Sequence, residues 1–147
     1  MAKALKKNIL SSTDNLLEIR EFVSEAARDF GFSEEETSKI ALAVDEACTN
    51  IIKHAYQSQS DKTIQVAIIR HPNKFEVSIV DEGRTFDPDA VKPLNLKEHL
   101  SHYRRGGLGV YLMRTLMDKV EYNLLSGKKN EVKLTKFLQP AKSGARR

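Results

Sequence analysis

Two polar side chains, Glu46 and Asn50, stand four residues apart in a segment whose apolar residues recur at helical spacing. Side chains four residues apart on a helix lie on the same face, one turn above each other. An asparagine amide oxygen can bind a hard cation, and a carboxylate beside it can orient or deprotonate a nucleophile. The pair is therefore a candidate reaction centre. For this spacing alone, an ordinary solvated helix face is the commoner case.

A second candidate is the segment Asp81-Glu82-Gly83, which directly follows a strand-like run of alternating apolar residues. A carboxylate at a strand end can accept a hydrogen bond from an exocyclic amine, and a neighbouring glycine allows close approach of the backbone. The segment is therefore a candidate site for an amine-bearing base. A simple turn after the strand is the alternative, and for these residues alone it is the commoner case.

The third candidate is the loop 106–109, which consists of Gly106, Gly107, Leu108 and Gly109 and stands directly before a helical pattern. Glycines in this position let backbone N–H groups and a helix N-terminus face an anion. Arg104 and Arg105 add positive charge beside the loop. The pattern fits neither a Walker A loop nor a dinucleotide fingerprint. It predicts phosphate binding, with a flexible hinge as the alternative.

The elements that carry these residues can be predicted from apolar periodicity and turn residues. Gly31 ends the first helical pattern, and Ser33 with Glu36 has the form of a capping box that opens the next. Since the strands pair through hairpins, we expect a mixed, largely antiparallel sheet with helices on one face, which is a two-layer α/β sandwich. The predicted order begins with a strand at 4–10, helices at 14–30 and 33–55, and a hairpin of strands 63–70 and 75–79. A helix at 110–120 and a hairpin of strands 121–125 and 131–138 follow.

Composition restricts the class of protein. With 40% hydrophobic and 30% charged residues, the chain is globular and not disordered. Its length suits one domain, predicted at 1–138, followed by a basic, flexible tail at 139–147. The net charge of +4 is scattered, which argues against nucleic-acid binding. Without an apolar signal-peptide core or a run approaching ~20 apolar residues, we expect a cytoplasmic protein that does not bind membranes.

Taken together and in order, the three candidates resemble the motifs of the GHKL ATPase superfamily. The segment 45–56 (DEACTNIIKHAY) is similar to its N box, 81–88 (DEGRTFDP) to its first glycine box, and 106–122 (GGLGVYLMRTLMDKVEY) to its second. The residues of the two glycine boxes are most similar to those of the RsbW-like anti-sigma-factor serine/threonine protein kinases. The resemblance extends over about residues 10–138 and implies the Bergerat ATP-binding fold.

The resemblance assigns a role to each candidate side chain. It implies that Asn50 ligates Mg²⁺, which bridges the phosphates of ATP, and that Glu46 activates the attacking hydroxyl or water. It implies that Asp81 accepts from the adenine amino group and that Gly83 lets the base come close. The catalytic residue is therefore expected to be Glu46, and the cofactors are expected to be ATP and Mg²⁺.

The same resemblance assigns the phosphates to the glycine loop and to its flanks. Gly106, Gly107, Leu108 and Gly109 form the phosphate loop, Arg105 is a candidate for the γ-phosphate, and residues 89–105 form a mobile lid. The family often has a Gly-Thr step entering the last strand near the adenine. This chain reads Lys128-Lys-Asn-Glu131 there, so Thr135 is the available candidate.

Kinases of this type bind sigma factors as dimers and phosphorylate a serine on a small antagonist protein, so the resemblance implies a homodimer with these two partners. A pure binding module, which holds ATP and a partner without phosphoryl transfer, is the main alternative. Glu46 favours the enzyme, because a non-catalytic site does not need that carboxylate. A sensor histidine kinase fragment is disfavoured, because residues 1–35 contain no histidine to accept phosphate.

Overall fold

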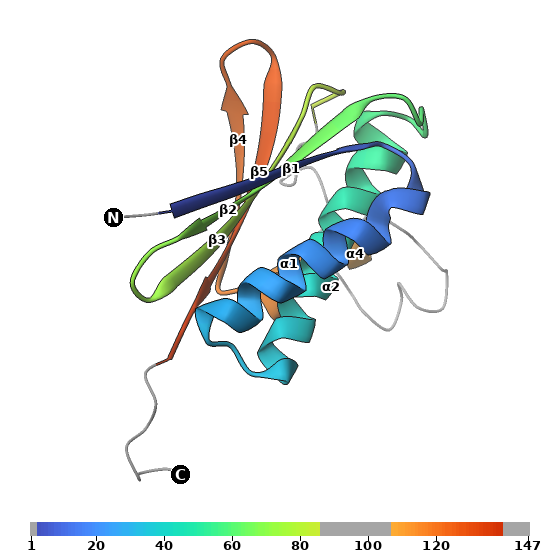
Figure 1. Cartoon of the computed structure of the whole chain (residues 1–147). Helices are drawn as coiled ribbons and strands as arrows, with labels where there is room; N and C mark the ends of the chain where they lie inside the picture. The colour runs from blue at the N-terminus through green and yellow to red at the C-terminus, as the bar shows by residue number, and fades with distance from the viewer. Residues whose placement is uncertain (1–2, 86–106, 140–147) are drawn as a thin grey trace, which may run out of the picture.

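The computed structural model describes residues 3–85 and 107–139, so the predicted lid and most of the predicted tail lie outside the described residues. A short 3-10 helix precedes α1, and a π-helical turn, η2, continues α2. Figure 1 shows these elements in chain order: β1 (Lys3–Leu10), α1 (Leu16–Phe30), α2 (Glu34–Asn50), η2 (Ile51–Ala55), β2 (Thr63–Arg70), β3 (Lys74–Asp81), α4 (Gly107–Leu116), β4 (Lys119–Leu125) and β5 (Lys129–Phe137).

The five strands form one sheet in the order β1-β2-β3-β5-β4. All four strand pairings among the described residues are antiparallel, so the sheet is more regular than the mixed sheet expected from sequence. The register between β3 and β5 places Asp81 directly opposite Asn130. The register therefore joins the end of β3 to the beginning of β5, and both of these strand ends contribute to the site.

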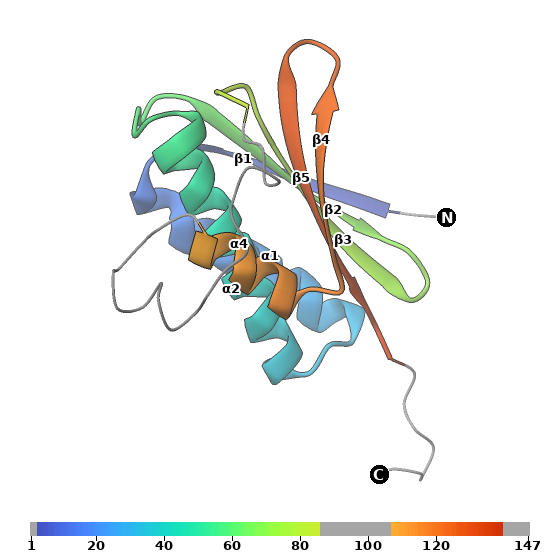
Figure 2. The same ribbon diagram turned by 180° about the vertical axis from the view of Figure 1, so that it is seen from behind.

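The helices α1, α2 and α4 cover one face of the sheet, as Figures 1 and 2 show from opposite sides. Alternate residues of each central strand face these helices, because side chains along a strand point to opposite faces in turn. The core between the two layers is apolar and includes the fully buried side chains Ile19, Val23, Ile40, Val44, Ile64, Val66, Ile68, Phe75, Val77, Ile79, Met113 and Leu134. The predicted two-layer α/β sandwich is confirmed.

The predicted helix limits before the site are also confirmed. Gly31 adopts the left-handed conformation with φ of 116°, as expected for a glycine that ends a helix. The side-chain oxygen of Ser33 accepts a hydrogen bond from the backbone N–H of Glu36 and so caps α2. These two residues fix the turn between α1 and α2. No helix within residues 3–85 and 107–139 is long and apolar enough to cross a bilayer.

The expected end of the third helix is wrong. The spacing of apolar residues continues to Val120, but α4 ends at Leu116 and Val120 belongs to β4, where it pairs with Leu134. The Lys136 side chain donates to the Leu116 carbonyl, and the Asp118 N–H donates to the Thr135 carbonyl, so the chain turns back into the sheet. Val120 packs against the core. An apolar residue at this position could do so from a helix or from a strand, so apolar periodicity alone did not show where the helix ends.

Candidate functional site

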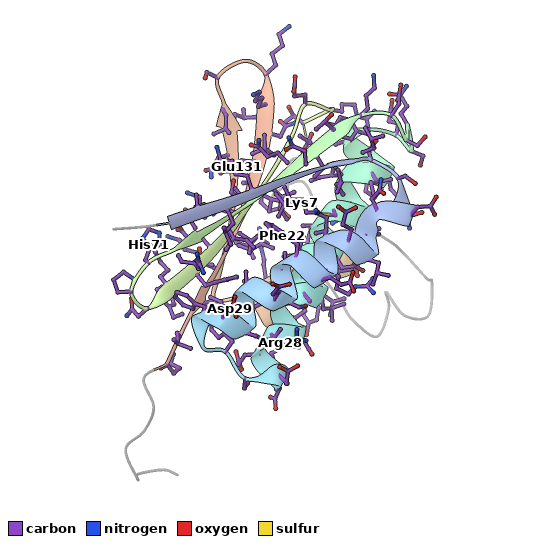
Figure 3. The ribbon with its side chains drawn as sticks, in the orientation of Figure 1. Lys7, Phe22, Arg28, Asp29, His71 and Glu131 are labelled. Atoms are coloured by element: carbon purple, nitrogen blue, oxygen red, sulfur yellow. The ribbon has the colours of Figure 1, made fainter. Side chains whose placement is uncertain are left out.

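A cavity of about 410 Å³ lies between the helix layer and the sheet. It is lined by residues from α2 and η2, from the end of β3 and the loop after it, from α4 and from the β4–β5 hairpin. The lining residues are Ala47, Asn50, Ile51, Ala55, Asp81, Arg84, Thr85, Met113, Tyr122, Asn123, Leu124, Asn130, Glu131 and Val132. Glu131, labelled in Figure 3, marks the β5 side of this cavity. All three motifs noted in the sequence therefore contribute side chains to one cavity, the segment 106–122 through Met113 and Tyr122.

Asp81 ends β3 and is 5% exposed. Its Oδ1 accepts two hydrogen bonds, from the Gly83 backbone N–H at 2.8 Å and from the Asn130 amide at 3.0 Å. No hydrogen bond joins Oδ2 to another of the described residues. Burial raises the pKa of Asp81, while the bonds from Asn130 and Gly83 act in the opposite direction. Asp81 is thus a buried acceptor with one oxygen held and one oxygen available.

Asn130 is a site residue that sequence reasoning missed. Its amide nitrogen donates to Asp81 Oδ1 and, at 2.9 Å, to the carbonyl oxygen of Gly83, and its amide oxygen accepts from the Thr85 hydroxyl at 3.1 Å. A single side chain therefore ties the end of β3 and the following loop to β5. The strand register, which places Asn130 opposite Asp81, is the signal that could have identified it.

Gly83 has a packing role that the sequence did not reveal. A Cβ at this position would lie 2.5 Å from the Ala55 carbonyl oxygen, well inside contact distance, and 2.9 Å from the Tyr56 ring. The Arg84 N–H donates to the same Ala55 oxygen at 2.8 Å. The Tyr56 hydroxyl accepts from the Glu82 N–H. Glycine is thus needed here to bring the loop against the end of the helix, in addition to any approach of a base.

The π-helical turn η2 supplies the helix end that Gly83 contacts. Directly after Asn50 the helix widens, and the Tyr56 N–H donates to the Ile51 carbonyl, five residues back. Single π-turns of this kind occur frequently at functional sites. Here the wider turn brings the Ala55 carbonyl to the loop after β3. The sequence predicted a continuous helix, since π-turns have no distinct apolar period.

Asn50 lines the cavity from the last turn of α2, and α4 packs closely against it. A Cβ added to Gly109 would lie 3.1 Å from the Asn50 amide nitrogen, so glycine allows the first turn of α4 to approach this side chain. Gly107 and Leu108 belong to the same first turn. Their backbone forms the helix N-terminus, where unpaired N–H groups favour an anion.

Glu46 lies one helical turn before Asn50 and is half-buried. Burial raises the pKa of its carboxyl, the negative charge of Asp45 raises it further, and Lys53 lowers it. A carboxylate with a raised pKa is a stronger base than a solvated one. Glu46 is not among the residues that line the cavity, so any contact with a reacting group would be made at its edge.

A family model for the histidine kinase-like ATPase domain matches residues 9–136. The chain belongs to this family. Within it, the chain also belongs to the RsbW serine-protein kinases, since it is 35% identical over 125 residues to RsbW of Halalkalibacterium halodurans, covering 82% of this chain and 75% of the relative. RsbW of Bacillus subtilis is 35% identical over 124 residues, covering 82% and 76% of the two chains.

Solved structures with the same fold extend this result. The RsbU and RsbW domains of a Mycobacterium tuberculosis protein superpose with a TM-score of 0.66 at 15% identity, covering 95% of this chain and 34% of that one. The SiaB–SiaC complex from Pseudomonas aeruginosa gives a TM-score of 0.68 at 18% identity, covering 89% and 88%. Both share the two-layer sandwich described above.

Thr135, the expected candidate near the adenine, does not line the cavity. It lies five residues beyond Asn130 on β5, about 17 Å along an extended strand. It pairs with Glu76 and Lys119. The strand alternation also directs it away from the core face occupied by Leu134. The position next to Asp81, where the family often has Gly-Thr, is occupied by Asn130.

Two further members of the predicted site, Arg105 and Gly106, lie outside the described residues, as does the lid at 89–105. Asn50, the side chain expected to bind Mg²⁺, lines the cavity. No group of three or more His, Cys, Asp or Glu side chains in residues 3–85 and 107–139 could hold a metal ion. One amide oxygen suits Mg²⁺ that keeps several waters and is otherwise bound by substrate phosphates.

Proposed function

We propose that the chain is an ATP-dependent serine protein kinase and anti-sigma factor, which phosphorylates a serine on a small anti-sigma-factor antagonist. The observation that carries the proposal is the joint contribution of Asp81 and Asn50 to one cavity, from opposite layers of the sandwich. An acceptor for a base amine and a ligand for a hard cation in one cavity suit a nucleotide with its metal. The curated relatives carry the name serine-protein kinase.

In the proposed complex, adenine donates its amino group to Asp81 Oδ2, which has no other partner among the described residues. The phosphates face the N-terminus of α4 and, outside the described residues, Gly106 and Arg105. Asn50 would hold Mg²⁺, and the bound ion would offset negative charge on the phosphate oxygens. Glu46 takes the proton from the serine hydroxyl as that oxygen bonds to the γ-phosphorus, while the bond from the γ-phosphorus to the β–γ bridging oxygen breaks and ADP leaves.

The proposed cellular role is an exchange of partners in the cytoplasm. A homodimer binds a sigma factor and releases it when the unphosphorylated antagonist binds instead. Phosphorylation adds about −1.5 to −2 charges at an interface fitted to a neutral hydroxyl, so the modified antagonist dissociates. Nucleotide and antagonist are expected to favour each other's binding, because the serine must approach the γ-phosphate in line and binding couplings are reciprocal.

The second candidate function is an ATP-binding module that holds a partner without phosphate transfer. The half-buried Glu46 carboxylate favours the enzyme, because burying an acidic group next to Asp45 costs stability and a binding module gains nothing from it. Both functions predict partner binding, so binding does not distinguish them. Transfer of phosphate to the partner is expected for the kinase only.

Replacing Asp81 by alanine should weaken Mg·ATP binding by about 1–3 kcal/mol, the usual loss when a buried hydrogen-bonding partner is removed. The parent protein should prefer ATP to GTP, since guanine carries a carbonyl where adenine carries the amine. Calorimetric titration with both nucleotides measures these affinities. Glu76→Gln, which alters the side-chain pairing of β3 with His71 and involves no cavity residue, is the matched control. Equal affinity of the parent protein for ATP and GTP would contradict the adenine assignment.

The choice of partner should depend on the nucleotide. When tagged protein is incubated with native cytoplasmic extract, we expect a sigma factor among the retained proteins. We also expect a small protein with a phosphorylatable serine to be retained more strongly with Mg·ATP than with Mg·ADP. Mass spectrometry identifies both. Recovery of neither protein with either nucleotide would rule out the exchange and leave the binding-module function.

A further inference from the structure

Asn130 makes more side-chain hydrogen bonds around the proposed base site than any other residue described there. Its amide group bonds to Asp81, to the Gly83 carbonyl and to the Thr85 hydroxyl. The residue lines the cavity beside Asp81, and the strand ladder holds the two backbones opposite each other. The family often has a Gly-Thr step here, and neither the family model nor the names of the relatives assigns a role to an asparagine at this position.

The neighbours of Asn130 fix which way its amide points. The Gly83 carbonyl oxygen can only accept a hydrogen bond, so the Asn130 atom 2.9 Å from it must be the nitrogen. That same nitrogen lies 3.0 Å from Asp81 Oδ1 and donates to it. The remaining amide oxygen then meets a donor, the Thr85 hydroxyl. A reversed amide would set oxygen against oxygen at two contacts, so a single orientation satisfies the group.

This orientation determines which oxygen of Asp81 is available to a ligand. Oδ1 already accepts from the Asn130 amide and from the Gly83 N–H. The two donors fix the plane of the carboxylate and favour its ionised form, because hydrogen bonds donated to a charged group stabilise the charge. The oxygen that is left, Oδ2, is then a charged acceptor with no donor among the described residues.

We propose that Asn130 positions Asp81 for base recognition and thereby sets the preference of this site for purines that carry an exocyclic amine. The inference rests on the proposed function, since it takes Asp81 to be the base acceptor. Without the Asn130 amide, the carboxylate can rotate and can take up a proton, and a protonated or rotated Asp81 accepts less well from an amine. Asn130 is therefore a positioning residue that acts through Asp81.

The test compares ATP with inosine triphosphate, in which a carbonyl replaces the exocyclic amine and N1 carries a hydrogen, while the sugar and the phosphates are unchanged. In Asn130→Ala, we expect the affinity for ATP to fall about tenfold, the size expected for a lost bond to a charged group, with little change for inosine triphosphate. The ratio of the two affinities therefore falls. The Glu76→Gln control, whose side-chain partner His71 is not a cavity residue, keeps the parent ratio.

A pH profile distinguishes positioning from a merely structural role. Around Asp81, the titratable or charged groups among the described residues are Glu82 in the same loop, Tyr56 at the end of η2, and Arg84 and Glu131 on the cavity lining. The bond from Asn130 lowers the pKa of Asp81, so Asn130→Ala raises it. ATP binding by this variant should then weaken at a higher pH than in the parent as the solution is acidified.

Asn130→Asp keeps the size of the side chain and should reverse the pH dependence of ATP binding. At about pH 8 two carboxylates face each other and ATP binding is weak, because like charges at this distance repel. Acidification to about pH 5 lets one proton be shared, and the protonated aspartate can donate to Asp81 as the amide did. ATP affinity should therefore partly recover as the pH falls. This variant also carries the test if Asn130→Ala does not fold.

The outcomes separate the two claims. An unchanged ratio of ATP to inosine triphosphate in Asn130→Ala, with the parent selective for ATP, overturns the role of Asn130 and leaves the proposed function intact. Parallel pH profiles for the parent, Asn130→Ala and Asn130→Asp overturn it as well. A parent protein that binds neither nucleotide overturns the role of Asn130 and the proposed function together.

Discussion

Replacing Glu46 by glutamine should slow phosphate transfer about 10²–10⁴-fold and leave Mg·ATP binding nearly unchanged. A positioned general base contributes a factor of this size. Glutamine keeps the shape of the side chain and can still accept a hydrogen bond, but it cannot take the proton of the attacking hydroxyl. Single-turnover transfer from γ-labelled ATP measures the rate, and calorimetry measures binding.

The pH profile and a control sharpen this prediction. Because burial and Asp45 raise the pKa of Glu46, transfer by the parent should slow as the pH falls through that pKa, since the base must be ionised. Glu46→Gln should lack this acid limb. Glu35→Gln, an exposed carboxylate on the same helix that pairs with Lys39, is the matched control and should behave as the parent. Transfer by Glu46→Gln at the parent rate would show that another group takes the proton.

Replacing Gly83 by alanine should both destabilise the protein and abolish most nucleotide binding. The added Cβ would lie 2.5 Å from the Ala55 carbonyl oxygen, and backbone atoms cannot yield as a flexible side chain would. The loop must shift, which breaks the bond from the Arg84 N–H to Ala55 and moves the Gly83 N–H away from Asp81. Overpacking of this kind costs about 1–3 kcal/mol or more, and ATP affinity should fall more than tenfold.

Denaturant unfolding measures the stability of the Gly83 variant, and titration with Mg·ATP measures its binding. Gly127→Asn serves as the control, because a Cβ at that position meets open space and asparagine tolerates the positive φ of 79°. Because only the positive φ is unfavourable for the new side chain, its loss of stability should be smaller than that of Gly83→Ala, and its ATP affinity should stay near that of the parent. If Gly83→Ala bound ATP as tightly as the parent, the contact with η2 would not be what holds the Asp81 loop in place.

Local patterns in the sequence predicted much of the fold and part of the site. The capping group at Ser33, the glycine at 31 and the alternating strands each depend on a few neighbouring residues, and all are found in the structure. Asn50 and Asp81 were identified because each stands at a recognisable position, on a helix face or at a strand end. Both line the same cavity, although 31 positions separate them in the sequence.

What the sequence did not reveal depends on contacts between distant elements. Asn130 joins the site only because the β3–β5 register sets it opposite Asp81, and register is not visible in a single strand. The same register would have shown that Thr135 lies five residues farther along β5 than Asn130. The tight contact of Gly83 depends on a π-turn, and Val120 could pack against the core from a helix or from a strand. In each case, contacts between distant elements decided between two local structures that the sequence pattern fitted equally well.

Transfer of labelled phosphate to a protein serine tests the central claim most directly. The parent protein is incubated with γ-labelled ATP, Mg²⁺ and the small proteins that it retains from the native cytoplasm. The account predicts label on a serine of one small protein, with no comparable label when Glu46→Gln replaces the parent. Tight ATP binding without label on any retained protein would contradict it and would make the chain a nucleotide-dependent binding module.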